Sequence, residues 1–452
     1  MEIPAEEAPP LGAVDDFSPA QRRRAIVAAV MGNGLEFYDF ITFAFFAIQI
    51  GHTFFPAGGD KFLSLMGSLA TFGAGFITRP LGAHILGGYA DRRGRKPAML
   101  ISMSMMGLGI VLLCVTPGYA RIGLAAPIIA VCARLVQGFA LGGEVGSATV
   151  YMMESARPER RGVTIGWQGA SQNVAATMGA LVGLILSSIL SASELSAYGW
   201  RIALVLGASI VPAALWIRNS LPETIDRPDT TPVANAGFAS YRRPIALGFL
   251  IIGTGTIGTY IFNYMATYGQ NTLHLSAPIS LGAEFAGNAI SIAAGLYGGW
   301  LSDRKGRRPV MIWPQLLFCL LTVPCFIWLT TQRDAVSFIG ANLILGILSS
   351  LQYSSAYAAI TEALPREVRA RAFALVYSIP VAAFGGTTQL VVTWLLKVTG
   401  APMAIAWYLT AINFIGLLAM WGMRESAPVK VGSSIARPSF RRASPIDRRR
   451  EG

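Results

Sequence analysis

Long runs of apolar residues dominate the chain and alternate with short polar segments that are rich in arginine. A helix needs about 20 mostly apolar residues to cross a bilayer. Runs of that kind occur twelve times, at residues 25–50, 62–90, 98–117, 124–153, 163–190, 201–217, 245–270, 281–301, 310–331, 336–360, 372–397 and 402–422. They are continuous, without the alternation of a transmembrane β-barrel. The first run lacks a small-residue cleavage site, so we expect it to be retained. The pattern predicts an all-α membrane protein with twelve transmembrane helices.

Composition supports this prediction and excludes other classes of protein. Of the 452 residues, 53% are hydrophobic and 13% are charged, whereas an ordinary soluble domain carries about 25% charged residues. So small a charged fraction cannot cover the surface of a soluble protein of this length. A disordered chain and a disulfide scaffold would also have different compositions.

The net charge of +12 could indicate a nucleic-acid partner. However, most of the basic residues lie before the first run, after the even-numbered runs and in the C-terminal tail. Membrane proteins concentrate Lys and Arg on the cytoplasmic side. We therefore predict that both termini are cytoplasmic, that the positive charge sets orientation in the lipid bilayer, and that the protein binds no nucleic acid.

The two halves of the chain repeat one plan. A polar, proline-rich segment at residues 220–244 divides the twelve runs six and six. The pattern Gly-x-x-x-Asp-Arg-x-Gly-Arg follows the second run at residues 87–95 and recurs after the eighth at residues 299–307. Such repetition indicates duplication, and duplicated bundles are typical of alternating-access transporters. We expect a cytoplasmic tail (1–24), a six-helix bundle (25–219), a cytoplasmic linker (220–244), a second bundle (245–423) and a basic tail (424–452).

These motifs make the sequence resemble the major facilitator superfamily over about residues 20–425. More narrowly, it resembles the metabolite:proton symporter branch through the strings at residues 32–40, 79–83, 134–139 and 167–172. Within that branch it looks most like the citrate:proton symporters. The resemblance implies two pseudo-symmetric six-helix bundles and a location in the inner (cytoplasmic) membrane of a bacterium. It also implies proton-coupled symport of a small organic acid into the cell, with no cofactor, by a protein that is not an enzyme and is a monomer.

The repeated cytoplasmic motif has a chemical interpretation of its own. A carboxylate at the end of a helix can cap a neighbouring helix N-terminus and pair with arginines. In the resembled family this network acts as a conformational latch, although it could also serve only orientation and anchoring. The latch residues implied here are Gly87, Asp91, Arg92, Gly94, Arg95, Asp303, Arg304, Gly306 and Arg307.

Ionisable residues inside membrane spans are costly and usually face a cavity or a partner. Five stand out in the N-terminal half: Glu36, Asp39, Arg79, Arg134 and Glu144. At about 1.5 Å per residue, Arg134 reaches the depth of Glu36 and Asp39. In a functional interpretation, protonation of the helix-1 acid frees Arg134 and couples the proton to substrate. In a structural interpretation, the pairs are permanent ion pairs that hold helices together. For Arg79 with Glu144 the two interpretations are equally open.

A small organic anion needs cationic, amide or hydroxyl donors near the midplane. Each such residue alone is more often a helix–helix hydrogen bond than a ligand. In the C-terminal half the one intramembrane charge is Glu284, near an outer end, so we expect the cationic part of the site in the N-terminal half. The candidate substrate-binding residues are Arg79, Arg134, Gln137, Gln168, Gln172, Asn173, Asn263, Tyr264, Gln352 and Tyr353.

Other chemistry finds little support in the sequence. The four cysteines and three histidines are too scattered for a metal site. The Gly-x-Gly-x-x-Gly string at residues 253–258 lies inside a membrane run, where it predicts close helix packing or bending and no dinucleotide fold. The alternatives kept open are a symporter of a zwitterionic osmolyte or a shikimate-like acid, a drug/proton antiporter, and a transporter-like sensor.

Overall fold

A computed structural model describes most of the chain: residues 34, 37–56, 58–93, 95–142, 152–153, 156–219, 241–365 and 369–431. Three of the predicted site residues, Glu36, Gly94 and Glu144, lie outside this part. The predicted linker is almost wholly outside it, as are the two tails apart from residues 424–431. The side chains of the first latch motif, including Asp91, Arg92 and Arg95, also lie outside the described part.

Every one of the twelve predicted runs overlaps a helix in the described residues. After a helical stretch at residues 37–45, the first half contains α2 (Ala47–Phe54), α3 (Lys61–Ile77), α4 (Arg79–Arg93), α5 (Arg95–Val115), α6 (Tyr119–Ile122), α7 (Ala125–Leu141), the short helix η2 (Pro158–Arg160), α9 (Arg161–Ile189), α10 (Ala192–Glu194), the π-helical η3 (Leu195–Gly199) and α11 (Trp200–Asn219). The second run is therefore divided at Thr78, between α3 and α4.

The second half is built in the same way, with two interruptions that the apolar pattern does not predict. It contains α12 (Arg242–Phe262), α13 (Met265–Asn271), α14 (Ala277–Lys305), α15 (Arg307–Gln332), α16 (Ala335–Ala363), α17 (Arg369–Pro380), the π-helical η5 (Val381–Gly385), α18 (Thr388–Thr399), α19 (Ala404–Gly422) and α20 (Pro428–Val431). The seventh run breaks at residues 263–264, and the eleventh passes through η5.

Length and composition agree with a membrane protein. Eight helices of the described residues are long and apolar enough to cross a bilayer, and residues 100–115 and 125–141 form shorter apolar helices. Caps mark where several helices begin. Asp60 accepts a hydrogen bond from the backbone N–H of Phe62 at the start of α3 (2.9 Å), and Asp334 accepts one from Ser337 at the start of α16 (2.8 Å). The hydrogen bonds that Ser337 donates hold the pKa of Asp334 below its usual value.

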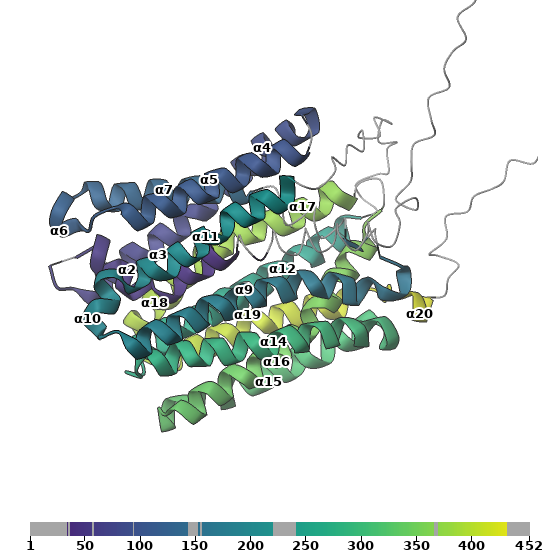
Figure 1. The fold of residues 1–452 in the computed structure, drawn as a ribbon. Coiled ribbons are helices and arrows are strands. Elements are labelled where there is room, and N and C mark those ends of the chain that lie inside the picture. The colour runs from purple at the N-terminus through teal and green to yellow at the C-terminus, as the bar shows by residue number, and fades with distance from the viewer. Residues whose placement is uncertain are drawn as a thin grey trace, which may run out of the picture.

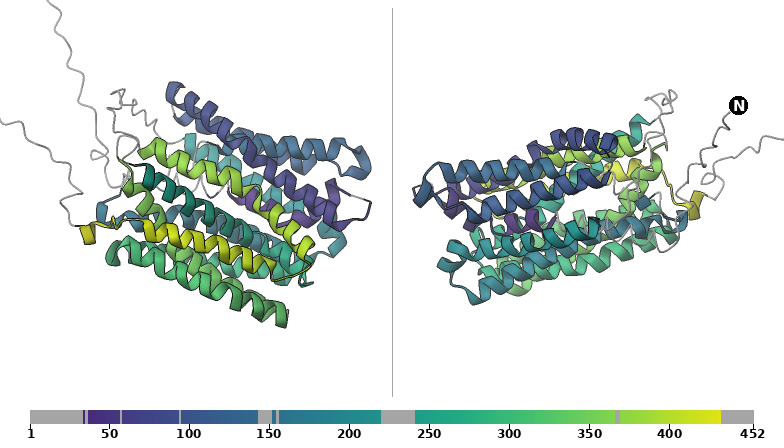
Figure 2. Two further views of the ribbon diagram at one scale, coloured as in Figure 1. Left: turned by 180° about the vertical axis from the view of Figure 1, so that it is seen from behind. Right: turned by 45° about the horizontal axis from the view of Figure 1, so that its top comes forward.

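The helices run side by side along one direction (Figure 1). Both views in Figure 2 place α5 and α7 at one side of the molecule and α15 and α16 at the opposite side. In between, α9 from the first half packs along α14 from the second, and α14 packs along α16. On the other side of the interface, α3 contacts η5 and α18. The two halves thus meet along α9–α14 and along α3–η5.

Close helix contacts depend on glycine at particular points. A Cβ atom added at Gly138 on α7 would overlap the carbonyl of Gly75 on α3, and one added at Gly298 on α14 would overlap the backbone of Leu351 on α16. A Cβ at Gly162 on α9 would lie 2.6 Å from the carbonyl oxygen of Gly299 on α14. Small residues let helix backbones approach to this degree.

Candidate functional site

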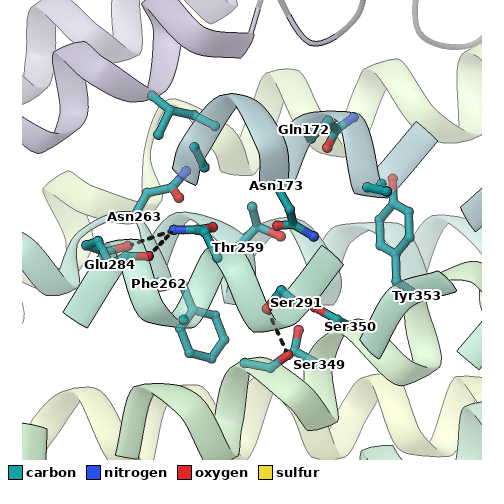
Figure 3. Close-up of a pocket in the computed structure, with 18 of the residues that line it drawn as sticks. Gln172, Asn173, Thr259, Phe262, Asn263, Glu284, Ser291, Ser349, Ser350 and Tyr353 are labelled. Atoms are coloured by element: carbon teal, nitrogen blue, oxygen red, sulfur yellow. Dashed lines mark hydrogen bonds between the residues drawn. The ribbon is translucent and has the colours of Figure 1, made fainter. Parts of the chain in front are cut away.

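A cavity between the two halves has a polar wall. Together with the solvent space at its open mouth, it measures about 950 Å³. Amide and hydroxyl groups from α9, α12, α14 and α16 surround it, as Figure 3 shows for Asn173, Thr259 and Asn263. Its polar side chains are Gln172, Asn173, Thr259, Tyr260, Asn263, Glu284, Asn288, Ser291, Asn342, Ser349, Ser350, Tyr353 and Ser354.

A second cavity of about 710 Å³ adjoins the first and shares part of its wall, including Gln172, Thr259 and Tyr353. It adds Gln315, Gln352 and other residues from the second half. Together the two cavities bring in five predicted donors: Gln172, Asn173, Asn263, Gln352 and Tyr353.

The buried ion pair of the first half lies behind this wall. Arg134 on α7 donates a hydrogen bond to Oδ2 of Asp39 at 3.1 Å, and the two side chains are 0% and 1% exposed. The same guanidinium donates to Oε1 of Gln137 at 2.7 Å and lies 3.9 Å from the ring centre of Phe43. Its Nε and Nη2 atoms have no hydrogen-bond partner among the described residues. Phe37 and Ile41, which flank Asp39 in the chain, line the cavity.

Arg79 is also close to the cavity without reaching it. Its guanidinium lies over the rings of Phe40 (4.6 Å) and Phe76 (4.1 Å). Phe76 in turn packs against Tyr260 with the ring centres 5.3 Å apart, and Tyr260 lines the cavity. Arg79 also interacts directly with the Tyr260 hydroxyl. It thus lies just behind Tyr260 on the cavity wall, where cation–π contacts stabilise its charge.

The remaining predicted donors contact other helices. Gln137 and Gln168 are buried outside both cavities. The hydroxyl of Tyr264 hydrogen-bonds Thr393 at 2.9 Å, which joins α12–α13 to α18. Their roles in substrate binding stay predictions. Among the described residues, neither cavity has an Arg or Lys on its wall, so the expected cationic contact is not direct in this conformation.

Sequence reasoning did not select the one carboxyl group on the described cavity wall. Glu284 on α14 is 4% exposed and lines the larger cavity (Figure 3). Asn288, one turn further along α14, donates to its Oε2 atom at 3.3 Å. Glu284 and Asn288 are four residues apart and therefore share one face of the helix. This pair is visible in the sequence and could have identified the site.

The second latch motif connects the two halves at the predicted cytoplasmic ends of α9 and α14. Oδ1 of Asp303 accepts a hydrogen bond from the backbone N–H of Gly162 (2.8 Å), and Oδ2 accepts one from Val163 (3.0 Å). Asp303 therefore caps the first turn of α9, where a negative charge is favourable. Arg307 donates to the same carboxylate at 2.7 Å.

Arg307 continues the network into two further acids. It donates to both oxygens of Glu362, at 3.2 and 3.0 Å, in the bidentate geometry that suits guanidinium and carboxylate. Glu425, beyond α19, accepts from the backbone N–H groups of Arg307 (2.7 Å) and Arg308 (3.0 Å) and so caps α15. Gly306, with φ of 103°, makes the turn between α14 and α15 that a side chain would strain.

Comparison with known proteins identifies the family. A family model described as Major Facilitator Superfamily matches residues 31–295 and 280–446. The chain belongs to the major facilitator superfamily. A citrate-proton symporter of Salmonella typhi is 38% identical over 402 residues, which are 87% of this chain and 92% of that protein. The alpha-ketoglutarate permease of Escherichia coli K12 is 32% identical over 404 residues, 88% of this chain and 93% of the permease.

The major facilitator fold is also found by structural comparison. A partially occluded, inward-open structure of the xylose transporter XylE from E. coli has a TM-score of 0.74. The aligned region covers 90% of this chain and 99% of the XylE chain, and the two sequences are 15% identical. The predicted fold class is confirmed, and the protein is a multi-pass bacterial membrane protein of a transporter superfamily.

Proposed function

We propose that this major facilitator protein is a secondary active transporter that imports a small organic acid together with protons by alternating access. The observation that carries the proposal is the buried Asp39–Arg134 pair, since the helical stretch that bears Asp39 contributes Phe37 and Ile41 to the wall of a polar cavity between the two halves. The names of two relatives, a citrate-proton symporter and an alpha-ketoglutarate permease, support a di- or tricarboxylate as the substrate.

Coupling follows from the chemistry of the pair. With Asp39 ionised, the charge of Arg134 is neutralised locally; with Asp39 protonated, the guanidinium is left to attract an anion. The Nε and Nη2 atoms of Arg134 have no hydrogen-bond partner among the described residues and could donate to such an anion. We include Glu36 and Glu144 as further candidate proton-coupling residues from the sequence.

The substrate would be held by the neutral donors of the cavity. Gln172 and Asn173 from α9 face Asn263 and Tyr353 from the second half across the same space. Amide and hydroxyl groups can donate to carboxylate oxygens from both halves, so binding would draw the halves together. The latch residues around Asp303 would hold the cytoplasmic side closed until the substrate-loaded protein rearranges.

We further propose that both termini are cytoplasmic, that the two bundles span residues 25–219 and 245–423, and that the transporter works as a monomer. The asymmetric distribution of basic residues supports the orientation.

The test is uptake by purified protein in proteoliposomes with an imposed pH gradient, inside alkaline. We expect uptake of labelled citrate or 2-oxoglutarate that collapses when an ionophore removes the gradient. Unlabelled shikimate and proline betaine serve as competitors that separate the organic-acid function from the alternatives. A protein that takes up none of the four with or without the gradient would contradict the proposal and favour a sensor.

One observation favours a second candidate function. Glu284 is an acid on a wall that has no described basic side chain, so it could receive the cationic group of a zwitterion such as a betaine. In that case labelled proline betaine would be taken up and citrate would not compete with it.

A further inference from the structure

Glu284 differs from every other buried acid of the described residues in having no basic partner. Asp39 pairs with Arg134, and Asp303 and Glu362 both pair with Arg307. The carboxyl of Glu284 is 4% exposed, its Oε2 accepts from Asn288, and its Oε1 has no hydrogen-bond partner in the described residues. Its other polar neighbour is the backbone of Ala266 on α13.

The charged groups on the surrounding helices are far from this carboxyl. On α14 itself the next charged residue is Asp303, about 28 Å along the helix at about 1.5 Å per residue. On α9, α15, α16 and α20, and on η2, charged side chains within the helices occur only at the latch end, and α13 has none. At the opposite end, Arg333 and Asp334 lie exposed between α15 and α16. The uncharged titratable groups on α12, α13, α15 and α16, and between α12 and α13, are Tyr260, Tyr264, Tyr268, Tyr353, Tyr357, Cys319 and Cys325; α9 has none.

An anion in the cavity would therefore meet Glu284 without an intervening positive charge. Two negative charges in a water-poor site repel strongly because the local dielectric constant is low. A protonated carboxyl reverses this interaction, because its O–H becomes a hydrogen-bond donor. Figure 3 shows the carboxyl on the same wall as Asn263, a predicted substrate ligand.

We propose that Glu284 is a substrate-contacting residue whose protonation admits the anion: the cavity binds an organic carboxylate only when Glu284 carries a proton. This inference rests on the proposed function and adds a second proton site in the other half of the molecule. Asp39 controls the availability of Arg134 behind the wall, whereas Glu284 acts on the wall by direct contact. At pH values where Glu284 is ionised in the empty protein, the binding of each anion is accompanied by uptake of one proton from solution at this carboxyl.

The test measures binding of 2-oxoglutarate to purified protein between about pH 6 and about pH 8, where both substrate carboxylates stay ionised. We expect wild-type affinity to fall by up to about tenfold per pH unit, as for any site that must be protonated. Glu284→Gln, which cannot ionise, should bind with an affinity that changes much less with pH. Glu284→Asp should keep the wild-type pH dependence, and Ser349→Ala should weaken binding equally at all pH values.

A second readout measures the proton directly. In weakly buffered solution with a pH indicator, wild-type protein should take up protons when 2-oxoglutarate binds at about pH 8, and Glu284→Gln should take up fewer. Unchanged pH dependence in a folded Glu284→Gln protein, or no proton uptake by wild type, would overturn the inference while anion binding itself still supports the proposed function. Failure of the wild-type protein to bind 2-oxoglutarate or citrate at any pH would instead count against the proposed function. Binding of proline betaine that Glu284→Gln abolishes would identify Glu284 as the site of a cationic group and refute its role as a proton site for anions.

Discussion

At the scale of single residues, we predict that the coupling of proton to substrate depends on Asp39. Its carboxylate is the one described acid in contact with Arg134, so its charge decides whether that guanidinium is neutralised. Asp39→Asn keeps the shape and an acceptor oxygen but removes the titration. We expect pH-driven uptake in proteoliposomes to fall to background, while exchange of labelled for unlabelled substrate continues.

The matched control for this prediction is Asp60→Asn. Asp60 caps the N-terminus of α3 and does not line the cavity, so that variant should keep gradient-driven uptake. Uptake by Asp39→Asn that still responds to the pH gradient would remove Asp39 from the coupling mechanism.

The residue scale also shows what depth estimates from sequence miss. The apolar run places the start of the eighth span at residue 281, which puts Glu284 only about 4.5 Å into the membrane at about 1.5 Å per residue. The helix begins at Ala277, so Glu284 lies about 10 Å along it. For Arg134 and Arg79 the error is the converse. Their charges are visible in the sequence, but the aromatic rings that pack against their guanidinium groups are not. Charge types can be predicted from sequence, whereas which side chains line the wall depends on packing.

At the scale of elements, the cap that Asp303 provides for α9 connects the two halves. The carboxylate accepts from two backbone N–H groups of α9 and one guanidinium of α15. Asp303→Ala should weaken closure by about 1 to 2 kcal/mol, the size of a lost N-cap and its charge interaction. Such a loss multiplies the open population by roughly 5 to 30.

The measurement is maleimide labelling of Ser350→Cys, on the cavity wall, in inside-out vesicles of an otherwise cysteine-free protein. We expect labelling from the cytoplasmic side to accelerate when Asp303→Ala is added. Asp334→Ala removes a comparable cap at the other end of the molecule and should leave the rate unchanged. Equal rates with and without Asp303→Ala would mean that the motif serves orientation or anchoring alone.

Helix packing gives a second prediction at this scale. Gly298→Ala places a methyl group against the backbone of Leu351 where α14 crosses α16, and overpacking of this kind costs about 1–3 kcal/mol. Gly255→Ala is the control, because a Cβ there meets nothing within 4 Å and alanine favours a helix by about 0.8–1.0 kcal/mol over glycine. In detergent, the melting temperature should fall for Gly298→Ala and should not fall for Gly255→Ala. A lower melting temperature for Gly255→Ala alone would contradict the packing argument.

The Gly-x-Gly-x-x-Gly string predicts close helix packing or bending. Of its three glycines, only Gly253 has a close neighbour, the ring of Phe384 at 3.1 Å. Gly255 has open space, and Gly258 has one atom at 4.0 Å. Apolar length predicts where the spans lie, but it does not predict the break at residues 263–264 or the π-helical η5.

At the scale of the whole molecule, the order of spans could be predicted because each helix must be about as long and apolar as the bilayer requires. The duplication could also be predicted, because the Asp-Arg-x-Gly-Arg motif is repeated in the sequence. How the halves meet could not be predicted in this way. The contacts of α9 with α14 and of α3 with η5 join residues far apart in the chain, and nothing in the apolar periodicity selects those partners.

Orientation in the membrane is the whole-molecule property that one experiment can decide. The basic loops predict that η2 faces the cytoplasm and that the turn between α15 and α16 faces outward. Glu159 and Gln332 are exposed side chains in these two places. In a cysteine-free protein expressed in cells with a permeabilised outer membrane, an impermeant maleimide should label Gln332→Cys at once and Glu159→Cys only after the inner membrane is opened. The reverse order of labelling would invert the topology, and with it the assignment of the Asp303 network to the cytoplasmic side.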